Sequence, residues 1–484
     1  MRHPTPILAL ALVAGCPKTA QVESAPPPAE QVRVVPGPLA TPAFQMPKTE
    51  TRQLSNGLGV VVATDEELPI FDLRLVFRVG RYLDPEGEEG LASVTFDMLN
   101  EGAGDLSAED ISRKLLRLGS TLDTSANVDL ATIRATGLVR NLEPTLDLLA
   151  TVLTAPTFPE EDWTILQRRR IADVIAARED PATVAHKASY RVLYGDTYRG
   201  RHATEDSYGA MTPEDMRAFY QEWVGPENAM VFVGGAVGAD RIAELLEARI
   251  GGWKPEDIEV ATPGAELSSP DESTLYFIDK PGAAQSVLRV ATPVGTRHDE
   301  DYFPLLMANE VLGGHFTSRV NLNLREDKGY TYGARCFIGN WDGPGVWGCS
   351  TSVQTEVTGP ALAELKKEIL DALGERPIAP DELSYFTSMQ VNAFPAGYET
   401  SAPILGEQIA IWRYGLPADW PEQYLPQVRS VTVEAANQAF RSHVAPDHLV
   451  WVVVGDRAAV WDDLSAVGVE VIELDREGNP IEGG

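Results

Sequence analysis

The sequence contains little cysteine and little histidine, with three and seven of them among 484 residues. Basic residues are also scarce, because 40 lysines and arginines face 71 acidic residues and leave a net charge of −31. This imbalance argues against nucleic acid as a partner and favours solubility or an attraction for cationic peptides. No hydrophobic run approaches the length that a membrane-spanning helix needs, so we expect a water-soluble body.

The N-terminus has the pattern of an export signal. A short basic start precedes an apolar run at residues 7–14, and small residues follow up to Cys16. An apolar core of this length is typical of a cleaved signal peptide over residues 1–16, and the cysteine at its end resembles a bacterial lipobox. An ordinary signal peptide with a chance cysteine is the alternative. Residues 17–48 are rich in proline and alanine and lack periodicity, which predicts a flexible tether.

This pattern predicts an exported lipoprotein whose lipid attachment site is Cys16. Pro17 follows the cysteine, where an aspartate would signal retention in the inner membrane of enteric bacteria. We therefore expect anchoring in the outer membrane, with the folded body facing the periplasm.

The two remaining cysteines, Cys336 and Cys349, flank a turn-rich stretch between two strand-like segments. The pattern places them opposite each other in a hairpin. An exported protein permits a disulfide there, but cross-strand geometry is often poor for one, so the sequence leaves both states open.

The chain contains an internal repeat at an offset of about 220 residues. Residues 211–235 and 431–455 each begin with a threonine cap, continue as an amphipathic helix, turn at proline and enter an apolar strand. Identical residues recur at corresponding positions: Thr212 and Thr432, Glu214 and Glu434, Val224 and Val444, Pro226 and Pro446, and Gly235 and Gly455.

The repeat predicts two similar domains, at residues 49–260 and 274–475, joined by a linker at residues 261–273 that is rich in proline, serine and acidic residues. Alternating strands with short connections favour antiparallel pairing, and long helices accompany them. The predicted class is therefore α+β, with a mostly antiparallel sheet backed by helices in each domain.

Common catalytic constellations are missing from the sequence. There is no Gly-x-Ser-x-Gly elbow and no phosphate-binding loop. Outside residues 1–16, no two histidines stand three or four residues apart, so we interpret all of them as isolated side chains: His186, His202, His298, His315, His443 and His448.

Several motifs resemble the pitrilysin/insulinase family of inverted zinc peptidases. The first half contains Leu-Ser-Asn-Gly at residues 54–57 and Gly-Leu-Ala-Ser-Val-Thr-Phe-Asp-Met-Leu-Asn-Glu-Gly at residues 90–102. The second half contains Leu-Gly-Gly at residues 312–314 and Arg-Glu-Asp-Lys-Gly-Tyr-Thr-Tyr at residues 325–332. The resemblance spans about residues 51–472 and implies the two-domain clamshell of mitochondrial-processing-type peptidases.

The zinc motif of that family is degenerate here. A His-x-x-Glu-His helix offers two imidazoles to one zinc ion and a carboxylate to the attacking water, whereas this chain has Ser93, Phe96 and Asp97 at those positions. On a later helix Asp173 lies nearest the third-ligand position. We expect Phe96 to fill the former metal site and Asp97 to pair with a basic residue or face solvent. The less favoured alternative is that the carboxylates of Asp97 and Asp173 hold a hard cation.

The second half retains the residues that the resemblance assigns to substrate. Arg325 and Tyr332 match the pair that holds substrate backbone and stabilises the oxyanion, and both side chains are suitable hydrogen-bond donors. Alternatively, Arg325 caps its helix, expected over residues 312–326, and Tyr332 is an ordinary strand aromatic. Gly313 and Gly314 form either a substrate-contacting loop or a simple bend.

These features predict a lipid-anchored, non-catalytic subunit that binds no cofactor itself. It would complete the active site of a zinc-bearing paralogue that cleaves peptides. A scaffold lipoprotein without any peptidase role is the main alternative, and an autonomous zinc peptidase is the least favoured.

Overall fold

The structure is a computed structural model that describes residues 44–255, 258–264, 267, 271–341 and 343–481. Cys16, the predicted signal peptide and most of the predicted tether lie outside the described residues. Within that part of the chain, none of the helices combines the length and hydrophobicity that crossing a membrane requires.

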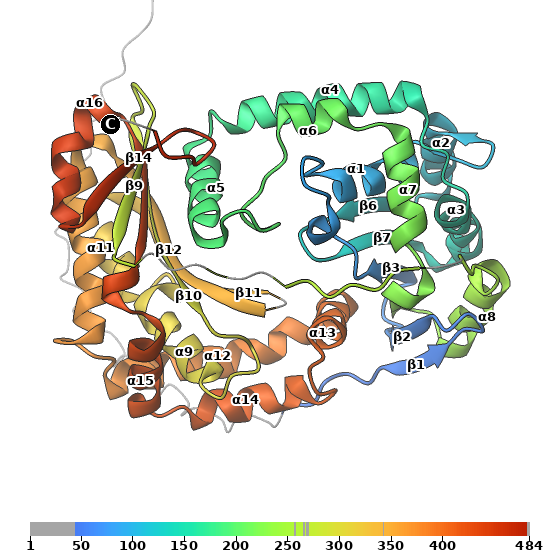
Figure 1. Cartoon of the computed structure of the whole chain (residues 1–484). Coiled ribbons are helices and arrows are strands. Elements are labelled where there is room, and N and C mark those ends of the chain that lie inside the picture. The colour runs from blue at the N-terminus through green and yellow to red at the C-terminus, as the bar shows by residue number, and fades with distance from the viewer. Residues whose placement is uncertain (1–43, 256–257, 265–266, 268–270, 342, 482–484) are drawn as a thin grey trace, which may run out of the picture. The chain divides into compact units, whose positions relative to one another are not determined.

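The first half is built on a six-stranded mixed sheet (Figure 1). Its strands, in spatial order, are β1 (Glu50–Gln53), β2 (Gly59–Thr64), β8 (Ala229–Gly235), β3 (Ile70–Phe77), β7 (Ala131–Leu138) and β6 (Thr121–Ala126). All neighbours are antiparallel except β2 and β8. A separate two-stranded ladder joins β4 (Gly102–Ala103) to β5 (Leu106–Ser107).

The second half repeats this topology strand for strand. Its sheet contains, in order, β14 (Glu470–Leu474), β9 (Thr274–Asp279), β13 (Val450–Gly455), β10 (Gln285–Val294), β12 (Gly343–Gln354) and β11 (Thr331–Trp341). Only the first edge strand differs, because β14 is parallel to β9 whereas β1 is antiparallel to β2. The prediction of two homologous α+β halves, each with a mostly antiparallel sheet, is confirmed.

Helices cover one face of each sheet and form its main core. The first core includes side chains of α1 (Leu91–Asp97), α2 (Ala108–Leu118), α3 (Leu142–Thr154), α4 (Glu160–Ala177), α6 (Glu205–Ala210), α7 (Pro213–Trp223) and α8 (Ala239–Ile250). The second includes side chains of α9 (Tyr302–Asn309), α10 (Arg319–Asn321), α11 (Thr358–Leu373), α12 (Pro380–Ala393), α14 (Trp420–Ser430), α15 (Val433–His443) and α16 (Arg457–Val460).

The predicted threonine caps are present in both copies. The Thr212 hydroxyl accepts a hydrogen bond from the Asp215 amide at the start of α7, and the Thr432 hydroxyl accepts one from the Ala435 amide at the start of α15. These bonds satisfy amides that have no partner inside the helix, and so they fix where each helix begins.

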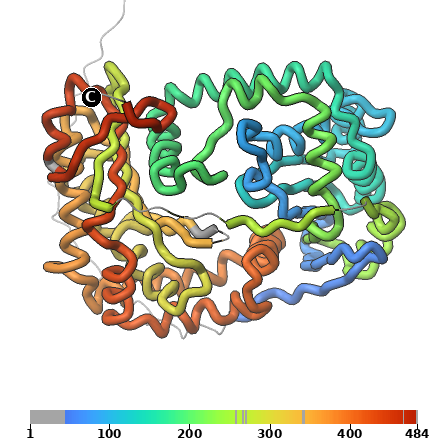
Figure 2. The backbone as a smooth tube through the Cα atoms, viewed as in Figure 1, coloured from blue at the N-terminus to red at the C-terminus, as the bar shows by residue number. Residues whose placement is uncertain are grey.

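The opposite face of each sheet is covered by a helix from the other half. Helix α5 (Pro181–Tyr194) packs its apolar side chains on β10 and β13 of the second sheet, whereas α13 (Ser401–Tyr414) packs Ile404 and Leu405 on the first sheet. Figure 2 shows both crossings, with green α5 beside the yellow and red strands and orange α13 beside the blue and green ones. Each half therefore completes the core of the other.

A buried carboxylate links the two crossing helices. Asp129 is 2% exposed, and one of its oxygens lies 2.8 Å from the guanidinium of Arg199, which follows α5. Its other oxygen pairs with Arg413 of α13. Nearby, the Arg78 guanidinium donates a 2.7 Å hydrogen bond to the Trp412 carbonyl and lies over the Trp412 ring.

We predict that Asp129→Ala destabilises the protein by about 3–5 kcal/mol, because it removes the carboxylate that neutralises two arginines in a desolvated site. Urea unfolding followed by circular dichroism measures the change. Asp105→Ala, at an exposed carboxylate, is the matched control and should stay within about 0.5 kcal/mol of the wild type. Equal effects of the two substitutions would contradict the linking role of Asp129.

Candidate functional site

Helix α1, which contains the degenerate zinc motif, has a well-formed start. The Asp84 carboxylate accepts hydrogen bonds from the Gly90 amide (2.7 Å) and the Ala92 amide (2.8 Å). Burial raises the pKa of Asp84 to about 7, although these two bonds oppose the rise. Gly90 has a φ of +107°, and a Cβ atom there would lie 2.7 Å from the Tyr208 ring, so the tight entry into the helix requires glycine.

The three degenerate positions on α1 have different environments. The Phe96 side chain is fully buried, with its ring 5.6 Å from that of Phe77 in the core. Asp97 forms an ion pair with Arg170 of α4, and Ser93 is half-buried. Asp97 therefore pairs with a basic residue, which was one of its two expected environments, the other being exposure to solvent. Phe96 adds an apolar side chain to the core.

Arg170 also lies close to the third predicted position. One of its terminal nitrogens is 3.8 Å from a carboxylate oxygen of Asp173, which lies one turn further along α4 and has a 56% exposed side chain. Burial is the largest single influence and lowers the pKa of Arg170, but the hydrogen bond to Asp97 and the nearby charges of Asp97 and Asp173 together raise that pKa overall. A guanidinium thus supplies the positive charge between the two carboxylates.

This arrangement does not fit a zinc site. A phenyl ring cannot bind metal or activate water, and Asp97 is already engaged by Arg170. Throughout the described part of the chain, histidine, cysteine, aspartate and glutamate form no group of three or more that could hold a metal ion. The sequence prediction overlooked Arg170, although its i, i+3 spacing from Asp173 on a helix is a recognisable signal.

Arg325 and Tyr332 lie on either side of the turn that leads into β11. Arg325 belongs to the π-helical segment Leu322–Asp327, where its guanidinium pairs with Glu326 at 2.6 Å and lies 4.3 Å from the centre of the Phe316 ring. Tyr332 is the second residue of β11 and is 95% exposed. Gly329 lies between this segment and β11 and has a φ of +67°.

The expectation of one helix over residues 312–326 was wrong. A π-helical segment ends at Gly314, a turn follows, and α10 begins at Arg319. The turn is closed by the Ser318 hydroxyl, which donates a 2.5 Å hydrogen bond to the His315 carbonyl.

Gly313 and Gly314 end the π-helical segment Glu310–Gly314, and the disulfide strand leaves no room for a side chain at Gly313. A Cβ atom at Gly313 would lie 2.2 Å from the Cys336 sulfur, and one at Gly314 would lie 2.8 Å from the Glu310 carboxylate. That carboxylate is nearly buried and lies 2.5 Å from His315, a pair that sequence reasoning missed because Glu310 falls in an apolar helical run.

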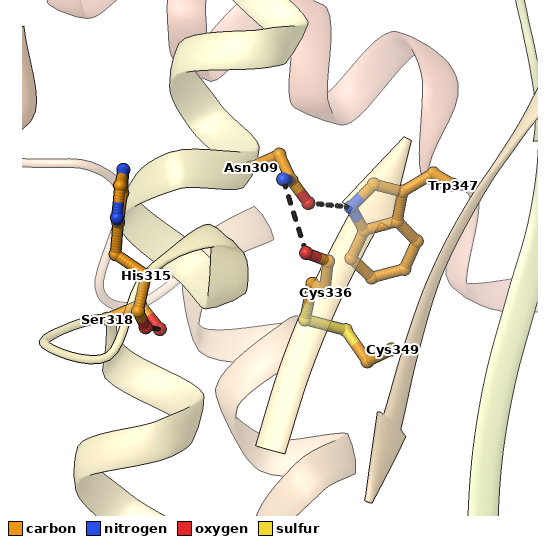
Figure 3. Close-up of a disulfide and its surroundings, with 6 residues drawn as sticks. All are labelled: Asn309, His315, Ser318, Cys336, Trp347 and Cys349. Carbon is orange, nitrogen blue, oxygen red and sulfur yellow. Dashed lines mark hydrogen bonds between the residues drawn. A yellow bond between two sulfur atoms is a disulfide. The ribbon is translucent and has the colours of Figure 1, made fainter. Parts of the chain in front are cut away.

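Cys336 and Cys349 form a disulfide between directly paired residues of β11 and β12 (Figure 3). Asn309 supports the pair, since its amide nitrogen donates to the Cys336 carbonyl at 3.4 Å and its oxygen accepts from the Trp347 indole at 3.0 Å. The structure thus resolves the alternative that the sequence left open. The bridge fastens the strand that carries Tyr332 to its neighbour.

We predict a coupling free energy of about 1 kcal/mol between Asp97 and Arg170, because the pair is about three-quarters buried. A double-mutant cycle of Asp97→Ala and Arg170→Ala, measured by urea unfolding, gives this value. Arg168 is an exposed arginine on the same helix, and a cycle with Arg168→Ala should give no coupling. A coupling of zero in the first cycle would contradict the ion pair.

Comparisons with known proteins agree with the fold. Residues 210–385 match the family described as the peptidase M16 inactive domain. The chain is 21% identical to a non-peptidase homolog, YmxG, of Helicobacter pylori over 84% of this chain and 94% of the relative. It is 22% identical to the zinc protease PqqE of the same bacterium over 82% and 91%.

Among solved structures, a peptidase M16 inactive domain from Pseudomonas fluorescens superposes with a TM-score of 0.77 at 24% identity, covering 84% of this chain and 98% of that one. Relatives thus include both a zinc protease and a non-peptidase. The resemblance to the pitrilysin/insulinase family is confirmed, and the chain is a homologue of the M16 peptidases that has a non-catalytic, peptidase-like scaffold.

Proposed function

We propose that this chain is the non-catalytic subunit of a two-chain zinc peptidase, in which it binds peptide and contributes Arg325 and Tyr332 to the active site of a zinc-bearing paralogue. The observation that carries the proposal is the contrast between the two halves. The zinc positions of the first half are closed by Phe96 and the Asp97–Arg170 pair, whereas Tyr332 in the second half is 95% exposed.

The exposure of Tyr332 supports a role toward another molecule. Large aromatic side chains normally bury most of their surface, and its neighbour Tyr330 is half-buried against the second core. Tyr332 lies in a register shift of the ladder with β12, and the paired residues on both sides of it and the disulfide at Cys336 hold the strand in place. An aromatic donor on a fastened strand is suited to contact a peptide backbone.

Arg325 and Tyr332 have the chemistry that peptide cleavage requires from a second subunit. When a peptide carbonyl is attacked, negative charge develops on its oxygen, and a guanidinium or a phenol can donate a hydrogen bond to that oxygen. The paralogue's zinc would supply the activated water. Arg325 now pairs with exposed Glu326, so engaging a substrate replaces only a surface ion pair of low energy.

The location forms part of the same proposal. A lipid on Cys16 and the tether at residues 17–48 would attach the body to the outer membrane on its periplasmic side. The relatives support the two-chain arrangement to the extent that one bacterium, Helicobacter pylori, has both a non-peptidase homolog and a zinc protease that match this chain.

We predict that Arg325→Ala or Tyr332→Phe lowers kcat/KM of the reconstituted complex about 100-fold or more, which is typical for loss of an oxyanion donor. Peptide hydrolysis by the complex with the paralogue measures this loss. Arg429→Ala and Tyr385→Phe, at exposed residues of the same types, are the matched controls and should leave activity unchanged.

Normal activity of both Arg325→Ala and Tyr332→Phe complexes would remove the catalytic contribution of this pair. If no zinc-bearing paralogue binds the chain at all, the scaffold interpretation replaces the proposal.

A further inference from the structure

Arg289 on β10 is a nearly buried arginine that has no acidic partner in the described part of the chain. It is 8% exposed, and within the described ranges it forms no ion pair and its Nε atom has no hydrogen-bond partner. Its guanidinium lies 5.4 Å from the centre of the Phe337 ring, and burial lowers its pKa. Desolvating an unpaired charge is costly, so a guanidinium kept in such a place indicates a ligand that neutralises it.

The strand register places a second arginine beside it. Arg289 is paired with Ser350 on β12, and Ser350 is paired with Arg335 on β11. Directly paired residues project from the same face of a sheet, so all three side chains lie on one face. Neighbouring strands are about 4.8 Å apart, so the backbones of the two arginines are about 10 Å apart, with Ser350 between them. Arg335 is exposed and has no ion-pair partner among the described residues.

The face that carries this row is the one covered by α5. Val287 and Ala291 alternate with Arg289 along β10 and pack with Tyr190 of α5, whereas Leu288 and Val290 point into the main core. Burial raises the pKa of the Tyr190 phenol, and the nearby charge of Arg289 opposes that rise. The guanidinium therefore lies where apolar and aromatic side chains reduce the local dielectric constant and strengthen any charge pair.

We propose that Arg289, Ser350 and Arg335 form a binding site for a carboxylate of a bound peptide, either an acidic side chain or the C-terminal carboxylate. Two guanidinium forks and a hydroxyl provide convergent donors, and arginine matches a carboxylate in bidentate geometry. The choice of a peptide as the ligand rests on the proposed function, whereas the carboxylate preference follows from the row itself. The site selects acidic peptides despite the net charge of −31.

Isothermal titration calorimetry of the purified chain, without any paralogue, tests the site. The probes are short peptides of glycine, alanine and serine that carry an internal Glu or Gln and end in a free acid or an amide. A buffer of about 0.15 M salt screens the overall charge beyond roughly 8 Å and leaves direct contacts. We expect at least one carboxylate to bind about tenfold tighter than its neutral counterpart, because only the charged group forms charge-assisted hydrogen bonds with the guanidinium groups. The Glu/Gln and acid/amide comparisons show which carboxylate is bound.

Two variants separate binding from structure. Arg335→Gln, at an exposed position, should abolish the preference without changing Tm. Arg289→Met should also abolish it and keep or raise Tm, since it removes an unpaired buried charge and retains the apolar stem. Arg429→Gln, at an exposed arginine away from the row, should keep the preference.

Equal affinity for charged and neutral peptides, or no binding of any probe, overturns the site. A preference for the carboxylate that survives in both variants also overturns the site. The same holds if Arg289→Met lowers Tm while Arg335→Gln keeps the preference, because Arg289 is then only a packing residue. None of these results depends on hydrolysis, so the proposed role of Arg325 and Tyr332 stands or falls separately.

Discussion

The exchange of covering helices between the halves is the constraint on which the rest of the structure depends. Each sheet has one face buried by its own helices and the other buried by α5 or α13 from the opposite half. Asp129, buried between Arg199 and Arg413, ties the two crossings together. Removing one member of such a buried group is strongly destabilising, because it leaves an uncompensated buried charge. Because neither half can bury both faces of its sheet alone, the halves are parts of one core system.

Within this framework the two halves differ in the side chains that they leave accessible. In the first half, Arg170 is the cation between Asp97 and Asp173, and the Phe96 side chain is buried in the core. In the second half, Tyr332 is exposed, and Arg289 and Arg335 have no acidic partner among the residues that the structure describes. The structure thus combines a closed, structural first site with a second half that retains unsatisfied binding chemistry. This division is the physical basis for assigning the chain a binding role.

Much of the fold could be predicted from the sequence, because the repeat leaves local signals at Thr212, Thr432, Pro226 and Pro446 that specify the same cap, turn and strand twice. The crossing of α5 and α13 could not, since an amphipathic pattern shows that a helix has an apolar face but not which sheet it covers. The single helix expected over residues 312–326 failed because the turn at His315 to Ser318 depends on a local side-chain bond. Arg289 was overlooked because the sequence shows only a single arginine in a strand. Its position beside Ser350 and Arg335 depends on the strand register, which the sequence does not give.

In the proposed function, this chain acts beside a zinc enzyme and binds no zinc itself. Native mass spectrometry with metal analysis, on the complex isolated through a tag on this chain, tests it most directly. The account predicts a one-to-one complex with a paralogue that has an intact His-x-x-Glu-His motif, one zinc ion per pair of chains and none in the chain alone. Stoichiometric zinc in the isolated chain, together with peptide hydrolysis in the absence of any partner, would contradict it.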